Sequence, residues 1–82
     1  MKKIRFTPHA EEKLTRLRDL GVTKEKVIQT VENPISVVSG YRGRKIAQGH
    51  LSGKLILRVI YEEYEDEIVV VTVYPAERRR YL

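Results

Sequence analysis

Two nearly continuous apolar runs constrain the fold more than any other feature of this 82-residue chain. They read KLILRVIYEEY (54–64) and EIVVVTVYP (67–75), and only a short acidic stretch separates them. Side chains branched at Cβ favour strands, and strands that are apolar at successive positions are covered on both faces. We therefore expect a hairpin of two central strands joined by a tight turn.

Three shorter runs predict the rest of the sheet. The first, KKIRF (2–6), alternates basic and apolar residues, as half-buried strands do. The other two are ISVVSG (35–40) and RKIAQGHL (44–51). The second of them runs into LSGK (51–54), which has the composition of a tight turn. The strands after residue 34 should therefore form an antiparallel meander.

Two helices are expected between the first strand and the meander. Thr7 is suited to cap the first helix, Pro8 to begin it and Gly21 to end it. Its apolar residues recur at helical spacing and predict a core face made of Ala10, Leu14, Leu17 and Leu20. The second helix should begin after Thr23, stop before Pro34 and bury Val27, Ile28 and Val31.

These elements predict an α+β fold, with an N-terminal strand and a two-helix hairpin packed on one face of a mostly antiparallel sheet of four to five strands. So short a chain should form one domain, residues 1–82. It has no cysteine and no apolar run long enough for a signal peptide or membrane span, so we expect a cytoplasmic protein without a membrane partner. Two histidines and no thiols predict neither a metal nor another cofactor.

Charge points to the kind of partner. The chain has 16 basic and 11 acidic residues, and five of the acids lie within residues 62–67. The rest of the chain therefore carries a net charge of about +10. Such an excess favours a polyanion, either nucleic acid or an acidic protein. The oligomeric state is left open.

Arg58 interrupts the most apolar stretch, LILRVIY. An unpaired guanidinium buried there would cost several kcal/mol, so an anionic partner is expected. One interpretation is an ion pair with Glu62, Glu63 or a helix carboxylate. The other is that the helices cover one face of the sheet while Arg58 lies on the other face and binds a phosphate, whose oxygens match the planar donors of arginine.

The preceding strand has a polar face formed by Arg44, Gln48 and His50. This face is either ordinary solvated surface or part of a phosphodiester-binding surface. A two-residue turn at Ser52–Gly53 would place Arg58 opposite Ala47 and away from the His50 face.

Tyr74 is either a packing residue or a ligand contact at the end of a central strand. A two-residue turn at Glu65–Asp66 would pair Arg58 with Val73, whereas a three-residue turn would pair it with Tyr74.

His9 lies in the first turn of the predicted first helix, where the helix dipole favours a neutral imidazole that can act as a base. The alternative is that His9 is an ordinary exposed residue at the start of a helix.

Two basic segments could bind a nucleic-acid backbone. SGYRGRK (39–45) places Tyr41 among Arg42, Arg44 and Lys45, as in loops that combine stacking with phosphate contacts. A solvated loop is the alternative. The terminal ERRRYL (77–82) is either a tail or a short ordered end.

The order of elements, together with TPHA (7–10), NP (33–34), LRVIYEE (57–63) and IVVVTVYP (68–75), resembles the RelE/ParE-like toxin superfamily over nearly the whole chain. Within that superfamily the motifs are most similar to the domain-of-unknown-function family 4258. The resemblance implies a RelE-like fold and a type II toxin: a metal-independent endoribonuclease that acts on RNA, often messenger RNA on the ribosome, and is inhibited by an acidic antitoxin protein.

The resemblance also implies roles for residues. Arg58 falls where RelE-like enzymes carry a phosphate-binding arginine, and Tyr81 lies near their C-terminal catalytic tyrosine. Their lysine pair corresponds here to Gly49 and Leu51, and their arginine after the last strand to Ala76.

We therefore expect His9 or Tyr74 to act as acid or base while Arg58 stabilises the transition state, with the 2′-hydroxyl as nucleophile. The expected RNA-binding residues are Tyr41, Arg42, Arg44, Lys45, Gln48, His50, Arg78, Arg79, Arg80 and Tyr81. The alternatives are a ParE-like inhibitor of a protein target and a basic module that binds RNA without cleaving it.

Overall fold

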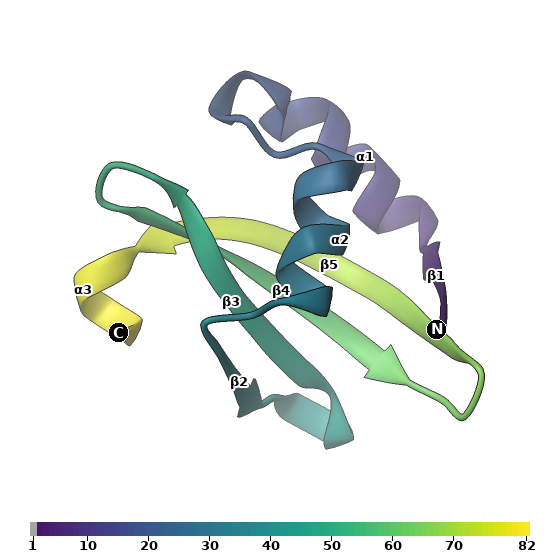
Figure 1. Ribbon diagram of the computed structural model, residues 1–82. Coiled ribbons are helices and arrows are strands. Elements are labelled where there is room, and N and C mark those ends of the chain that lie inside the picture. The colour runs from purple at the N-terminus through teal and green to yellow at the C-terminus, as the bar shows by residue number, and fades with distance from the viewer. Residues whose placement is uncertain (1) are drawn as a thin grey trace.

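The computed structural model describes residues 2–82 and has the expected α+β architecture (Figure 1). Five strands and two longer helices account for most of the chain; short helical turns fill two connections, and a third follows the last strand. The elements are β1 (Lys3–Phe6), α1 (Pro8–Leu17), η1 (Arg18–Leu20), α2 (Lys24–Glu32), β2 (Ser36–Ser39), η2 (Tyr41–Gly43), β3 (Lys45–Ser52), β4 (Leu55–Glu63), β5 (Glu67–Glu77) and α3 (Arg78–Tyr81).

The strands form one sheet in the order β1-β5-β4-β3-β2. Strands β2 to β5 make the expected antiparallel meander, and β1 returns to pair in parallel with β5. The two apolar runs are therefore interior strands. Most of their middle side chains are buried, which explains why the two runs contain so few polar residues.

Helices α1 and α2 cover one face of the sheet (Figure 1). The core lies between them and the sheet. Its fully buried residues include Ala10 and Val27 from the helices and Leu57, Val59 and Val73 from the strands. Because side chains alternate along a strand, Arg58, between Leu57 and Val59, lies on the opposite face.

Both expected helix caps are confirmed. The Thr7 hydroxyl accepts a hydrogen bond from the Ala10 amide, and the Thr23 hydroxyl accepts one from the Lys26 amide. Gly21 follows η1 with a φ of 85°, a left-handed conformation that favours glycine. The prediction for Leu20 was wrong: its side chain is 46% exposed, because α1 gives way to the tighter turn η1 after Leu17 and rotates Leu20 off the core face.

Gly49 lets α2 approach the sheet. A Cβ atom at this position would lie 2.9 Å from Thr30 Cγ2 and 3.1 Å from Thr30 Oγ1. Thr30 is buried on α2, and its hydroxyl donates to the Lys26 carbonyl. The glycine therefore sets how closely the helix packs on β3.

Two irregularities decide which residues lie beside Arg58. The β4–β5 turn is tight, with Tyr64 donating its amide to the Glu67 carbonyl, as a two-residue loop requires. However, the register shifts between Ile60 and Tyr61, and the extra residue of β5 brings Tyr74 opposite Arg58. The expectation that a two-residue turn pairs Arg58 with Val73 was wrong because a β-bulge, and not the turn, supplies the extra residue.

A second shift, between His50 and Ser52, places Arg58 opposite Gln48. The turn at Ser52–Gly53 that would place Arg58 opposite Ala47 does not form. Ser52 pairs with Leu55, so the loop residues are Gly53 and Lys54.

Within residues 2–82, no helix is long and apolar enough to cross a membrane.

Candidate functional site

A row of polar side chains crosses the sheet on the face opposite α1 and α2. Ser36, Gln48, Arg58 and Tyr74 are successive register partners on β2, β3, β4 and β5. Gln48 Nε2 donates to Ser36 Oγ at 2.7 Å, and Arg58 donates from a terminal guanidinium nitrogen to the Tyr74 hydroxyl at 2.6 Å. We call these four residues the polar row.

Arg58 is held by aromatic side chains. Its Cζ atom lies 3.8 Å from the centre of the Tyr81 ring and 5.5 Å from that of Tyr74. The interpretation of Arg58 as half of an internal ion pair was wrong: no carboxylate of residues 2–82 pairs with it, since Glu62 bonds Arg44 and Tyr64 while Glu63 bonds two lysines. Stacking on an electron-rich ring compensates part of the cost of burying the cation.

The two central residues of the polar row are buried although they lie outside the main core. Gln48 is 1% exposed and Arg58 is 8% exposed, so Gln48 is not part of a solvated face. Two of their buried atoms, Gln48 Oε1 and Arg58 Nε, have no hydrogen-bond partner. An unpaired buried donor and an unpaired buried acceptor each carry a free-energy cost, which makes this row the most polar and least satisfied part of the interior.

The two histidines do not meet at this row. His9 is exposed at the start of α1, and α1 packs on the opposite face, so the sheet separates His9 from Arg58. The expectation that His9 and Arg58 act in one site is therefore wrong. His50 lies on the Arg58 face, because it alternates with Gly49 two residues beyond Gln48, and its side chain is exposed.

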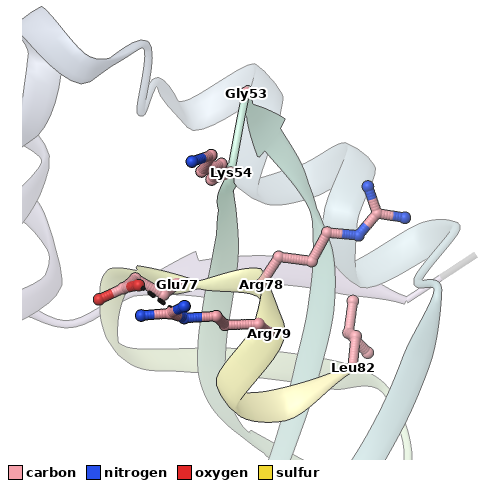
Figure 2. A pocket seen from close by; sticks show the side chains of 6 residues that line it. All are labelled: Gly53, Lys54, Glu77, Arg78, Arg79 and Leu82. Atoms are coloured by element: carbon pink, nitrogen blue, oxygen red, sulfur yellow. Dashed lines mark ion pairs between the residues drawn. The ribbon is translucent and has the colours of Figure 1, made fainter.

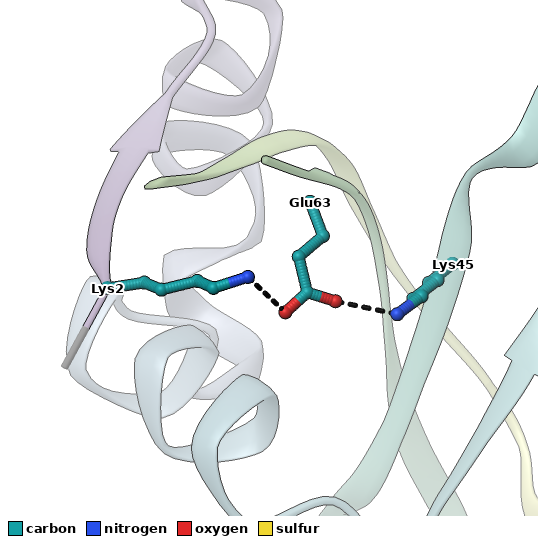
Figure 3. A network of polar contacts seen from close by, with 3 residues as sticks. All are labelled: Lys2, Lys45 and Glu63. Atoms are coloured by element: carbon teal, nitrogen blue, oxygen red, sulfur yellow. Dashed lines mark hydrogen bonds and ion pairs between the residues drawn. The ribbon is translucent and has the colours of Figure 1, made fainter. Parts of the chain in front are cut away.

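Two of the expected RNA-binding cations already have carboxylate partners. Arg44 Nε lies 3.0 Å from Glu62, and Lys45 Nζ lies 2.6 Å from Glu63. Glu63 also accepts from Lys2 Nζ at 2.8 Å (Figure 3). These two lysines lower the pKa of Glu63 to about 2, and the hydrogen bond from Arg44 lowers the pKa of Glu62.

The C-terminal residues form an ordered turn. Arg78, Arg79 and Arg80 are all exposed in α3, and the Arg78 amide donates to the Lys54 carbonyl at 2.7 Å. Between this turn and the β3–β4 loop is a pocket of about 570 Å³ (Figure 2). Its lining consists of Gly53, Lys54, Glu77, Arg78, Arg79 and Leu82. Arg79 is paired with Glu77 at 3.4 Å.

The basic segment of residues 39–45 joins β2 to β3. Tyr41 is 80% exposed, with Arg42 Cζ 5.6 Å from its ring centre, and Arg42 has a left-handed φ of 59°. Tyr41 thus presents an exposed ring with a cation beside it, a combination suited to stacking on a base.

Two polar residues near these features were missed. Ser36 could be placed on the row only with the register of the β2–β3 hairpin, which its loop determines. Lys54 looked like a turn residue, and its position beside α3 depends on a contact between distant parts of the chain.

Within the described chain, no cluster of three or more histidine, aspartate or glutamate side chains could hold a metal ion.

Comparisons with protein-family models, curated proteins and solved structures find no match to this chain. The polar row and the basic residues around it are therefore the features of the molecule that bear on its function.

Proposed function

We propose that the Arg58 face binds a phosphodiester of RNA and that the protein is a RelE/ParE-like toxin of a type II toxin–antitoxin pair, acting in the cytoplasm as a metal-independent endoribonuclease. One observation carries the proposal: Arg58 is a nearly buried guanidinium without a carboxylate partner in the described chain. A cation without a counterion in a poorly solvated position favours an anionic ligand, and guanidinium matches phosphate oxygens two at a time.

In this proposal the RNA 2′-hydroxyl attacks the adjacent phosphorus and the 5′-oxygen leaves. The products are a 2′,3′-cyclic phosphate and a 5′-hydroxyl. Arg58 stabilises the charge that develops on the phosphate oxygens. Tyr74, whose hydroxyl accepts from Arg58, exchanges a proton with the attacking or leaving oxygen, and His50 on the same face takes the second proton-transfer role in place of His9.

The phosphate reaches Arg58 only after the Tyr81 ring moves aside, because Arg58 is buried and its guanidinium lies 3.8 Å from the centre of that ring. The backbone of the RNA is then held by exposed cations beside the row. Arg78 and Arg80 are suited to this, since neither forms an ion pair within residues 2–82. An acidic antitoxin would compete for the same cations.

Binding without cleavage is the second candidate, and a specific observation favours it. One terminal nitrogen of Arg58 already donates to Tyr74, and the His9 imidazole lies across the sheet. A basic module that binds RNA or an acidic protein needs no acid or base beside the arginine.

The test uses a defined, end-labelled RNA incubated with the purified protein in the presence of a chelator. Arg58→Ala should lower the cleavage rate by roughly 100-fold or more, as expected for loss of one group that stabilises transition-state charge. Arg18→Ala is the matched control, because Arg18 is an exposed arginine after α1 on the other side of the sheet.

The outcomes separate the candidates. Cleavage that survives the chelator and fails in Arg58→Ala supports the nuclease, and equal cleavage by both arginine variants contradicts it. Salt-dependent binding of intact RNA that weakens in Arg58→Ala but not in Arg18→Ala supports the binding module. Binding that is the same in the two variants contradicts the Arg58 site altogether.

A further inference from the structure

The two edges of the sheet are protected very differently. Strand β1 presents exposed Lys3 and Arg5, and Arg5 pairs with Glu67 on its neighbour. Strand β2, at the opposite edge, lies within residues 33–41, which contain no charged side chain in a chain that is 33% charged. Charged residues are the usual protection of an edge strand against pairing with another chain, and β2 has none.

Apolar exposure is concentrated at the same edge. Among the described residues, eight large hydrophobic side chains are exposed, and four of them fall within residues 35–41. Ile35 is 55% exposed, Val37 46% and Val38 39%. Val37 and Val38 point to opposite faces, so the strand is apolar on both sides of its free edge.

The hydrogen bonds to β3 determine which backbone groups of β2 point outward. The Gly40 amide donates to the Arg44 carbonyl at 2.7 Å, and Val38 pairs with Ile46 in the same phase of the ladder. In an antiparallel ladder, bonding pairs alternate with non-bonding pairs. The amides and carbonyls of Val37 and Ser39 are therefore directed away from β3, toward the free edge.

We propose that β2 pairs with β2 of a second copy of this chain, antiparallel and symmetric about Val38. In this register Val37 is opposite Ser39 of the partner subunit, and Ser39 is opposite Val37 of the partner subunit. All four outward backbone groups of each copy are then bonded, which gives four hydrogen bonds across the two-fold axis. Val38 meets its own counterpart at a non-bonding pair, where side chains approach most closely.

Charge favours a second copy over an acidic partner at this edge. Two copies with a net charge of +5 repel each other, but β2 itself carries no charge. Of the basic residues that follow it, Arg44 is paired with Glu62 and Lys45 with Glu63, which leaves Arg42 as the one without an ion pair in the described chain. Two neutral apolar edges can therefore meet, whereas an acidic strand would find no free cation on β2 itself.

The pairing makes one continuous sheet with the two Arg58 residues on the same face, because a two-fold axis normal to the sheet preserves the faces. The inference does not depend on the proposed function, since its residues lie outside the polar row except for Ser36, which retains its bond to Gln48.

The first test measures mass by sedimentation over a range of protein concentrations. The unmodified chain should shift from monomer to dimer, and Val38→Lys should stay monomeric, because two lysines would face each other at the axis. Leu20→Lys is the matched control: Leu20 is as exposed as Val37 but lies in η1, and this variant should dimerise normally. Thermal unfolding shows whether each variant is folded.

The second test fixes the register in a chain that has no native cysteine. Opposed residues at a non-bonding pair have Cα atoms about 4.5 Å apart, within the range that a disulfide spans. Under mild oxidation Val38→Cys should form a covalent dimer faster than Val37→Cys. A monomer at every concentration, a dimer that persists in Val38→Lys, a dimer lost equally in Leu20→Lys, or equal cross-linking of the two cysteine variants would each overturn the proposal.

Discussion

At the scale of single residues, Arg58 is a charged side chain buried among apolar neighbours on its strand. Its guanidinium stacks on Tyr81 and bonds Tyr74, while its Nε atom has no partner. Cation–π contacts contribute about 0.5–2 kcal/mol, less than an isolated buried charge costs. These contacts thus offset part of the cost of burying Arg58. An anionic ligand would stabilise the cation further.

Replacing Tyr81 tests this view of Arg58. Tyr81→Ala removes the ring 3.8 Å from the guanidinium and should lower the free energy of unfolding by about 1 kcal/mol. It should also increase modification of Arg58 by phenylglyoxal, measured by peptide mass spectrometry. Tyr41→Ala, at a tyrosine 80% exposed, is the control and should change neither quantity. Unchanged reactivity of Arg58 in Tyr81→Ala would show that the ring does not shield it.

Gly49 is the second residue on which the packing depends. Gly49→Ala brings a methyl group 2.9 Å from Thr30 Cγ2, and we expect it to destabilise the protein by about 1–3 kcal/mol. Chemical denaturation measures the change. In a Thr30→Ala background the same substitution should cost less, because the nearest atoms are gone. Equal costs in the two backgrounds would mean that the contact does not limit the approach of α2.

At the scale of elements, the bulge in β5 connects the sheet to the first helix. The extra residue that brings Tyr74 beside Arg58 also leaves the Val71 carbonyl free to accept from the Thr7 hydroxyl at 2.9 Å. The same hydroxyl accepts from the Ala10 amide at 3.1 Å. Thr7 therefore caps α1 and attaches its start to β5 at the irregular position.

Removing the Thr7 hydroxyl should weaken both functions. We expect Thr7→Val to lower the free energy of unfolding by about 1–2 kcal/mol, through loss of a cap and of a hydrogen bond to the sheet. Thr7→Ser keeps the hydroxyl and should lose much less. Denaturant titration of the two variants distinguishes the hydroxyl from the side-chain volume, and equal losses would contradict the role of the hydroxyl.

At the scale of the whole molecule, ion pairs at one end of the sheet join distant parts of the chain. Glu63, at the end of β4, bonds Lys2 before β1 and Lys45 at the start of β3 (Figure 3). Its pKa of about 2 is lower than the ordinary value of 4.5, because both lysines favour the charged form. A pKa lowered by folding contributes stability above the unfolded pKa, and this contribution is lost as the pH falls through the folded one.

The pH dependence of unfolding tests this network. The contribution of Glu63 should be complete at pH 7 and should decline between about pH 4.5 and about pH 2. Glu63→Gln should lower the melting temperature at pH 7, and its difference from the unmodified chain should shrink across that interval. Glu65→Gln, at an exposed turn residue without an ion pair in the described chain, is the control. A difference that is the same at pH 7 and pH 2.5 would contradict the assignment.

Much of the fold could be predicted because its signals are local. Hydrophobic period, caps and turn residues act within a few positions, so the strands, the helices, Thr7 and Thr23 were placed correctly. Leu20 was placed wrongly because a local pattern does not reveal where a helix tightens into η1. The candidate site was predicted less well, because a site depends on which distant residues share a face.

The amino-acid sequence by itself determined the class of fold, the interior position of the two apolar strands and the exceptional character of an arginine between Leu57 and Val59. Only the tertiary structure decided what surrounds that arginine. Two register shifts brought Gln48 and Tyr74 beside Arg58, the C-terminal turn placed Tyr81 over it, and the sheet separated it from His9. A shift of one residue moves every side chain to the other face, and no local pattern encodes such a shift.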